Sequence, residues 1–362
     1  MDLLRAFRDE SEAKKIIKQI NELNPKPCNI MEVCGGQTHT ILKYGVEAML
    51  HPNINLIHGP GCPVCVTAIE AIDYAIDLSL NKDVIFCTYG DMLRVPGSKS
   101  DLFKAKGQGA NIKIIYSPLD AIKIANDNQT KQIVFFAIGF ETTAPANAMV
   151  LLQAKLLKLK NFLVLSQQVL VPPMIASLLQ SQENRINAFL GPGHVCSVMG
   201  LKEYEKLVDH FKIPIIITGF EPLDILYGIY YAVQQLQGHK AQLYNQYSRC
   251  VSSEGNVIAQ SAMQDVFSVC DRKWRGIGTI PKSGLKISYA YKEFDVSNFY
   301  NFDVLPVEES SECISGQILK GLKKPPQCPC FGTKCTPATP YGATMVSSEG
   351  ACAAYYKYAR PG

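Results

Sequence analysis

Short apolar runs alternate with longer stretches of mixed polarity along most of the chain. The first such stretch, residues 2–23, has its leucines, isoleucines and one phenylalanine roughly at helical spacing, and it predicts an amphipathic helix. Eight apolar runs follow in order: CNIMEV (28–33), INLIHG (54–59), DVIFCTY (83–89), IKIIYS (112–117), IVFFAIGF (133–140), NFLVLSQ (161–167), INAFLG (186–191) and PIIITGF (214–220). Strands that alternate with helices are typical of parallel sheets that carry helices on their faces. The pattern therefore predicts an α/β fold.

A weak internal repeat suggests how these strands are divided. The segment IHGPGCPVCVTAIEAIDYAID (57–77) resembles FLGPGHVCSVMGLKEYEKLVD (189–209), because each has an apolar strand, Gly-Pro-Gly, a nearby cysteine and a helix. A duplication would give two similar parallel-sheet domains, 1–130 and 131–240, around a central cleft lined by the carboxyl ends of the strands. Chance recurrence of Gly-Pro-Gly in two loops explains the similarity equally well.

The chain changes character after residue 240. A helix is predicted over 250–270, and from residue 311 the sequence is dense in Cys, Pro and Gly. A segment of this kind buries little apolar surface and needs another cross-link to hold it together. We therefore expect a third domain, 241–362, that is helical and loop-rich. Its last helix should begin at Ser347 or Ser348 and carry Cys352.

Composition narrows the class of protein. The net charge is +4 with no run of Lys or Arg, so nothing indicates a nucleic-acid partner. No apolar run is long enough to span a membrane, and the first residues lack the pattern of a signal peptide. We expect a cytoplasmic protein. In that reducing compartment, a chain with 13 cysteines is more typical of metal binding or thiol chemistry than of disulfides.

Four cysteines of the last domain are candidate cluster ligands. Cys313, Cys328, Cys335 and Cys352 are separated by 14, 6 and 16 residues. Zinc sites usually present two close pairs of ligands, whereas a [4Fe–4S] cluster accepts thiolates from separated loops. The spacing favours the cluster, with a zinc site and a set of buried structural thiols as the alternatives. We treat Cys330 as an incidental neighbour.

The segment MEVCGGQTHT places Cys34 at a strand end, on a Gly-Gly turn that opens a helix. The amino end of a helix lowers the pKa of a thiol, so the pattern predicts a reactive, metal-binding thiolate. His39 is a candidate second ligand or proton carrier, or alternatively a structural residue. Gln37 and Thr38 are candidate hydrogen-bonding partners of a bound group.

A second thiol motif, GPGCPVC, holds Cys62 and Cys65 at the next junction of strand and helix. The Cys-x-x-Cys spacing is that of a dithiol–disulfide couple, with Cys62 nearer the start of the helix. Half of a zinc site is the alternative, but no second pair has suitable spacing. The two motifs put three thiols on adjacent strand ends.

Four further strand ends carry polar residues in glycine-rich settings. They are Asp91 in CTYGDMLRVPGS, Glu141 in GFETTAP, His194 in GPGH and Glu221 in GFEP. Each is a candidate for the lining of the cleft, or alternatively a loop residue with its hydrogen bonds satisfied locally. No phosphate-binding loop or dinucleotide-binding motif occurs in the sequence.

In combination these motifs resemble the hydrogenase maturation factor HypD family, and the resemblance runs from about residue 12 to the C-terminus. It implies two α/β domains and a [4Fe–4S] module. It also implies work with the small chaperone HypC and the cyanide-supplying HypE on the Fe(CN)2CO unit of [NiFe] hydrogenases. Some members have His where this chain has Gln37, so an imidazole role there would fall to His39.

The resemblance also implies roles for the thiols. Cys34 would hold a transient mononuclear iron with CN and CO ligands, Cys62 and Cys65 would be the redox pair, and the four C-terminal cysteines would ligate the cluster. We hypothesise that electrons pass from the cluster through Cys62/Cys65 to the iron on Cys34. The alternative function is an iron–sulfur thiol–disulfide reductase acting on partner proteins. On the first function the protein would be a redox-active metallocentre assembly factor rather than a conventional turnover enzyme.

Overall fold

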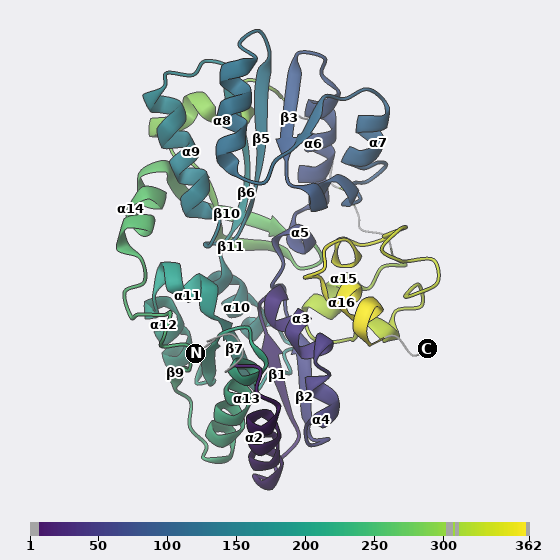
Figure 1. Cartoon of the computed structure of the whole chain (residues 1–362), viewed down its shortest axis with the longest axis vertical. Helices are drawn as coiled ribbons and strands as arrows, with labels where there is room; N and C mark the ends of the chain where they lie inside the picture. The colour runs from purple at the N-terminus through teal and green to yellow at the C-terminus, as the bar shows by residue number, and fades with distance from the viewer. Residues whose placement is uncertain (1–6, 302–306, 308–310, 360–362) are drawn as a thin grey trace.

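The structure is a computed structural model that describes residues 7–301, 307 and 311–359. Within this part of the chain the strands form two sheets, one in each lobe of the molecule (Figure 1). The five-stranded sheet of the lower lobe has the order β2-β1-β7-β8-β9, all parallel. Its strands are β1 (Cys28–Glu32), β2 (Ile54–His58), β7 (Ala188–Pro192), β8 (Ile215–Thr218) and β9 (Leu243–Asn245).

The six-stranded sheet of the upper lobe has the order β10-β11-β6-β5-β3-β4. Its core of β6, β5, β3 and β4 is parallel, and the β10–β11 hairpin is added antiparallel to β6. Its strands are β3 (Val84–Thr88), β4 (Ile112–Ile114), β5 (Gln132–Gly139), β6 (Phe162–Val169), β10 (Phe267–Trp274) and β11 (Gly278–Ile287). The predicted α/β class is confirmed, and each of the eight predicted strands is present, as β1 to β8.

Helices cover both sheets and connect them. In the first half of the chain they are α2 (Glu10–Glu22), α3 (Gly35–Lys43), α4 (Val46–Met49), α5 (Pro63–Val66), α6 (Ile69–Leu80), η1 (Gly90–Arg94), α7 (Leu102–Gly107), α8 (Pro118–Asp127), α9 (Ala144–Leu156) and α10 (Val171–Gln180). In the second half they are α11 (Gly193–Met199), α12 (Lys202–Phe211), α13 (Pro222–Gln237), α14 (Val257–Val266), η2 (Tyr289–Phe294), η3 (Val296–Asn298), α15 (Ser315–Leu319), η4 (Pro325–Gln327), η5 (Ala343–Met345) and α16 (Ala351–Tyr358). No helix in these described residues combines the length and apolar character that a membrane span requires.

The strands of each sheet are not consecutive in the chain. After β2 the chain leaves the lower sheet to build β3 to β6, returns for β7 to β9, and then adds β10 and β11 to the upper sheet. The ranges 1–130 and 131–240 therefore each contribute strands to both sheets. The two Gly-Pro-Gly strands, β2 and β7, lie on either side of β1 in the same sheet. The duplication hypothesis required the two Gly-Pro-Gly strands to lie in two separate sheets. Both strands instead belong to the lower sheet.

The predicted helices need three corrections. Residues 2–6 lie outside the described part of the chain, and the first helix starts at Glu10 behind the N-cap Asp9. The helix predicted over 250–270 is confirmed only at Val257–Val266, because the next residues pair with β11 as strand β10. The last helix carries Cys352 as predicted but starts at Ala351, with Gly350 as its N-cap.

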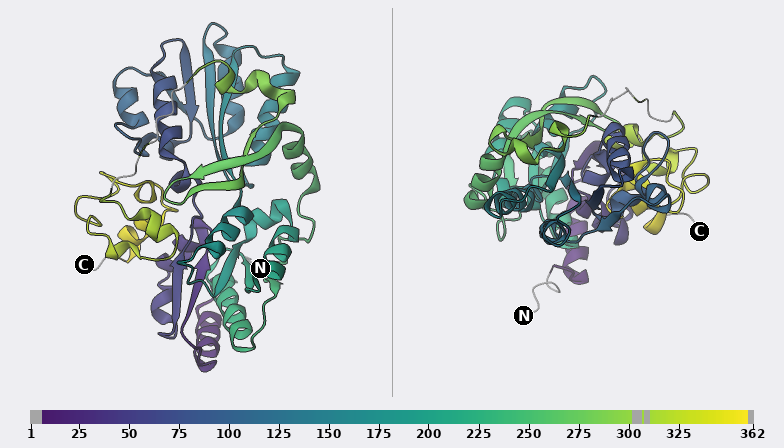
Figure 2. Two further views of the ribbon diagram at one scale, coloured as in Figure 1. Left: turned by 180° about the vertical axis from the view of Figure 1, so that it is seen from behind. Right: turned by 90° about the horizontal axis from the view of Figure 1, so that it is seen from above.

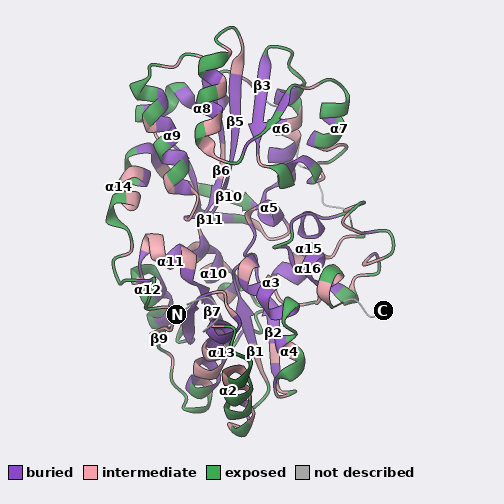
Figure 3. Ribbon diagram, viewed as in Figure 1, coloured by how far each residue is buried: buried purple, intermediate pink, exposed green. Residues whose placement is uncertain are grey.

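A continuous apolar core joins the two lobes. One cluster of buried side chains includes Met31 and Phe189 of the lower sheet together with Phe136 and Leu165 of the upper sheet. The inner strands of both sheets are buried, and exposed residues lie mainly on the outer helices and on the edge strands β4, β9 and β10 (Figure 3). The β10–β11 hairpin crosses the back of the molecule between the lobes (Figure 2), where the Arg275 amide donates to the Val66 carbonyl at 2.8 Å. The lobes are therefore held by shared packing.

The C-terminal segment lies beside the junction of the lobes. Helix α16 packs on α3, and η5 packs on α5, so this segment covers the ends of β1 and β2 (Figure 1). Gly61 makes a close contact between the loops that follow β1 and β2, because a Cβ added there would fall 2.3 Å from the Cys34 amide nitrogen. No side chain fits at that distance without backbone movement.

We therefore predict that Gly61→Ala lowers the free energy of unfolding by about 1–3 kcal/mol, the usual cost of an overpacked interior. The single tryptophan, buried Trp274, allows urea unfolding to be followed by fluorescence. Gly107→Ala is the matched control, because a Cβ at Gly107 meets nothing within 4 Å. An equal shift of the unfolding midpoint in both variants would contradict the packing argument.

Candidate thiol and metal site

Cys34 follows β1 and is the N-cap residue of α3. The two glycines after it allow other segments to approach. A Cβ at Gly35 would fall 2.4 Å from the Cβ of Glu349, and one at Gly36 would fall 3.0 Å from the Phe220 ring. The Cys34 side chain is consequently 5% exposed. The predicted position at a helix start is confirmed, but the thiol is enclosed rather than open.

This enclosure reverses the predicted acidity of Cys34. Burial raises the pKa of the thiol far above its ordinary value, and the backbone amides of Gln37 and Gly36 lower it by less. The charges of Glu349 and Glu32 raise it further. The helix start therefore does not lower the pKa of Cys34 overall, because removal from water outweighs the few amides that a helix end provides.

The histidine beside Cys34 is His194, from the start of α11. The Cys34 Sγ lies 3.6 Å from His194 Nδ1, and the imidazole also packs edge-on to the Phe220 ring. Burial lowers the pKa of His194 to about 4, so the ring is neutral at physiological pH. His39 instead contacts the C-terminal helix, where its Nε2 lies 3.3 Å from the Tyr358 hydroxyl. His39 was a candidate partner of Cys34 because it lies five residues away in the sequence, but the residue beside the sulfur is His194.

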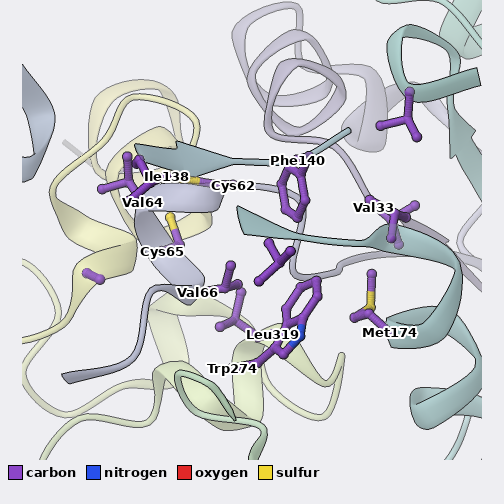
Figure 4. Packing of buried hydrophobic residues seen from close by; sticks show 14 of the residues in the cluster. Val33, Cys62, Val64, Cys65, Val66, Ile138, Phe140, Met174, Trp274 and Leu319 are labelled. Atoms are coloured by element: carbon purple, nitrogen blue, oxygen red, sulfur yellow. The ribbon is translucent and has the colours of Figure 1, made fainter. Parts of the chain in front are cut away.

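Cys62 and Cys65 lie on the neighbouring loop, at the start and within the short helix α5. This loop is fastened to the Cys34 loop by a hydrogen bond from the Gly35 amide to the Gly61 carbonyl, 3.0 Å long. Both thiols are buried in the core that joins the lobes, near Val64, Val66 and Ile138 (Figure 4). The three thiols of the two motifs therefore lie on loops in direct contact, as the sequence predicted.

Cys65 also touches the C-terminal segment. Its sulfur would lie 3.0 Å from a Cβ built on Gly350, which caps the helix that carries Cys352. Burial raises the pKa of Cys65 well above its ordinary value, and the neighbouring Cys62 and Cys352 add to the effect. Cys65 is thus within electrostatic reach of one thiol on each side.

The four predicted cluster ligands converge in the C-terminal segment. Burial raises the pKa of Cys352 to about 12, and Cys313, Cys335 and Cys328 add to the shift through their charges. Polar groups point at two of the sulfurs: the Tyr341 amide donates to Cys335 at 3.3 Å, and the Thr344 hydroxyl donates to Cys352 at 3.2 Å. Amide and hydroxyl donors around thiolates are characteristic of iron–sulfur sites.

No three His, Cys, Asp or Glu side chains in the described residues form a group that could hold a metal ion. A [4Fe–4S] cluster or a zinc site on these four cysteines therefore stays a prediction. Cys330 lies in the same buried cluster as Cys335 and Cys352, and its Sγ is 3.8 Å from Glu312 Oε2.

Two of the candidate cleft residues hold the Cys34 helix in place. The buried Gln37 amide donates to the Gly191 carbonyl at 3.0 Å and to the Thr218 hydroxyl at 2.6 Å. The buried Thr38 hydroxyl donates to the Glu32 carboxylate and contacts the Cys34 carbonyl. In this structure both residues position α3 against the lower sheet, and neither projects into open space.

The other candidates have separate environments. Glu141 is buried, accepts a hydrogen bond from the Val171 amide at 2.9 Å, and has its pKa raised by burial to about 7. Glu221 is the N-cap of α13 and is paired with Arg8, which points to a structural role. Asp91 is exposed on η1; burial raises the pKa of the Glu349 carboxyl, and the negative charge of Asp91 raises it further.

Comparison with known proteins identifies the family. Residues 11–359 match the HypD family model, described as "Hydrogenase formation hypA family". The chain is 46% identical to the hydrogenase maturation factor HypD of Escherichia coli (strain K12) over 366 residues, which cover 99% of this chain and 98% of that relative. This chain belongs to the HypD family. It is also 46% identical to hydrogenase maturation factor HypD2 of Bradyrhizobium diazoefficiens (98% of this chain, 96% of the relative) and 42% identical to HypD of Rhodobacter capsulatus (99% and 98%).

Three polar residues of this HypD chain were missed by the sequence analysis. Glu32 and His58 end the neighbouring strands β1 and β2 and form a fully buried pair, with 2.7 Å between Glu32 Oε1 and His58 Nδ1. Tyr355 of α16 lies on the other side of the imidazole. The available signal was an ionisable residue inside each of two apolar runs. Nothing local in the sequence indicated Tyr355.

We predict that His194→Ala speeds alkylation of Cys34 by iodoacetamide several-fold, because it removes a side chain that covers the sulfur. His39→Ala should leave that rate unchanged, since His39 contacts Tyr358 instead. Peptide mass spectrometry after timed labelling gives the rate for Cys34 alone. If alkylation became faster in His39→Ala and stayed unchanged in His194→Ala, His39 would again be the candidate partner of Cys34.

Proposed function

We propose that this protein acts in hydrogenase maturation as the scaffold that assembles the Fe(CN)2CO group of [NiFe] hydrogenase. Its partners would be a HypC-type small chaperone and a HypE-type cyanide donor. Family membership supports the role in hydrogenase maturation. The finer proposal rests on one observation, the contact of three cysteine loops. Gly61 packs on the Cys34 backbone, and Gly350 packs on the Cys65 sulfur.

In this proposal Cys34 binds the iron, which is cargo and not a resident cofactor. The enclosure of Cys34 suits such a cargo, because it keeps water from the metal while ligands are added. His194 contacts the sulfur and is itself partly exposed, so it is the neighbour through which the iron and a partner thiol would reach Cys34. The neutral imidazole adds no positive charge that would oppose a cation.

Cys62 and Cys65 would serve as a two-electron store next to the iron. When the two thiols join as a disulfide they release two electrons and two protons. Their loop lies between the Cys34 loop and the C-terminal segment, which suits transfer in either direction. A [4Fe–4S] cluster on Cys313, Cys328, Cys335 and Cys352 would supply single electrons beside Cys65.

The burial of the dithiol weighs against the alternative of a disulfide reductase acting on partner proteins. A protein disulfide must reach the attacking sulfur in line, and this requires an exposed thiol. Cys62 is 3% exposed and Cys65 is 1% exposed. A reductase would also have no need of Cys34, whose loop is built into the same contact.

We predict that the double variant Cys62→Ser/Cys65→Ser retains the visible absorbance of the cluster but fails to support hydrogenase maturation. The reason is that the serines keep the packing of α5 and remove only the redox couple. Cys250→Ser is the control, because Cys250 is an exposed thiol outside the three loops. Full hydrogenase activity in cells that carry the double variant would refute the relay.

The iron site has a separate test. We predict that protein purified with its partners contains iron beyond that of one cluster and has infrared bands of metal-bound CN and CO. Cys34→Ser should lose the bands and the additional iron while the cluster absorbance remains, since the two sites use different cysteines. Persistence of the bands in Cys34→Ser would show that the iron is held elsewhere.

A further inference from the structure

A buried row of polar side chains runs beneath the Cys34 loop. It begins at Glu32, whose carboxylate accepts hydrogen bonds from the Cys34 amide at 3.0 Å and from the Thr38 hydroxyl. The same carboxylate lies 2.7 Å from Nδ1 of His58, and both side chains are 1% exposed. Strand pairing places Glu32 directly opposite His58. This carboxylate therefore fixes the start of α3, which is the turn that carries Cys34.

The row continues into the C-terminal segment. His58 Nε2 lies 3.2 Å from the Tyr355 hydroxyl, and the two rings meet edge-on with centroids 5.4 Å apart. The Tyr355 hydroxyl also lies 3.4 Å from Glu47 Oε2, and Glu47 is ion-paired with Lys324. Tyr355 is three residues beyond Cys352 on α16, so the two side chains share one turn of the helix.

Buried polar groups of this kind are costly unless each is paired, so the row is stable only as a complete set. Removal of one member leaves its neighbours unsatisfied in an apolar surround. Hydrogen bonds depend on direction, whereas apolar contacts do not. A displacement of one side chain in the row therefore displaces the next one.

We propose that Glu32, His58 and Tyr355 are positioning residues through which the C-terminal cysteine segment sets the conformation of the Cys34 loop. Metal binding at Cys352 fixes α16 and hence Tyr355. Tyr355 holds the His58 ring, His58 holds the Glu32 carboxylate, and Glu32 holds the Cys34 amide. The effect of metal binding rests on the proposed function, whereas the hydrogen-bonded connection does not. The assembly site would thus be ordered only when the C-terminal segment is.

Tyr355→Phe tests the connection, because it keeps the ring that packs on His58 and removes only the hydroxyl. We expect alkylation of Cys34 in the purified full-length protein to be about tenfold faster in this variant, the factor that corresponds to one lost buried hydrogen bond. Tyr358→Phe is the matched control, since it removes a hydroxyl that contacts His39 one turn further along the same helix. Wild-type rates in both variants would overturn the proposal.

His58→Gln provides a second variant from the middle of the row and should give the same acceleration. Urea unfolding of each variant separates a local change from general destabilisation. If Cys34 alkylation follows only the unfolding midpoint, so that any variant of equal stability reacts equally fast, the residues are structural and the proposal fails.

A final comparison tests the dependence on metal. Removal of the cluster from wild-type protein should raise the Cys34 rate to that of Tyr355→Phe, and removal from Tyr355→Phe should change nothing further. An unchanged wild-type rate on cluster removal would overturn the metal dependence. If the purified protein has no cluster absorbance, the proposed function fails instead, and the comparison of Tyr355→Phe with Tyr358→Phe still decides the connection.

Discussion

The contact between the Gly61 loop and the Cys34 backbone is the constraint on which the thiol site depends. The two loops follow neighbouring parallel strands, and a parallel pair leaves its carboxyl ends at the same edge of the sheet. A side chain at position 61 would separate the loops, since a Cβ there would overlap both the nitrogen and the Cα of Cys34. Glycine at this position is what allows Cys34, Cys62 and Cys65 to share one enclosed volume.

Burial then determines how readily the thiols in that volume lose their protons. The same packing that brings the thiols together removes them from water and raises the pKa values of Cys34 and Cys65. It also makes unpaired polar groups beneath the loops costly, and the Glu32–His58 contact pairs two such groups inside an otherwise apolar sheet edge. The cost of burying these groups is offset by their hydrogen bonds to each other and to the Cys34 amide and Thr38 hydroxyl, which also fix the start of α3.

Local patterns in the sequence were sufficient for the strands and for the sets of cysteines. The eight apolar runs became strands because each is bounded by turn residues, and the spacing of Cys313 to Cys352 pointed to ligands on separate loops. Long-range neighbours were not accessible in this way. His39 is five residues from Cys34 and faces Tyr358, whereas His194 is 160 residues away and touches the sulfur. The expected lowering of the Cys34 pKa was reversed for a related reason. Burial raises that pKa, and burial depends on what the rest of the chain places over the helix start.

The alternation of the chain between the two sheets explains why the site lies at their junction. The segment after β2 must leave the lower sheet to begin the upper one, and it passes through Cys62, Cys65 and α5 as it does so. The hairpin β10–β11 is fastened to this same segment through Arg275 and Val66. The thiol pair therefore occupies a crossover held by elements of both lobes, and a movement of one lobe relative to the other would act on it directly. A site built on a crossover is fixed only as firmly as the packing of the two lobes, and here that packing is continuous through the shared core.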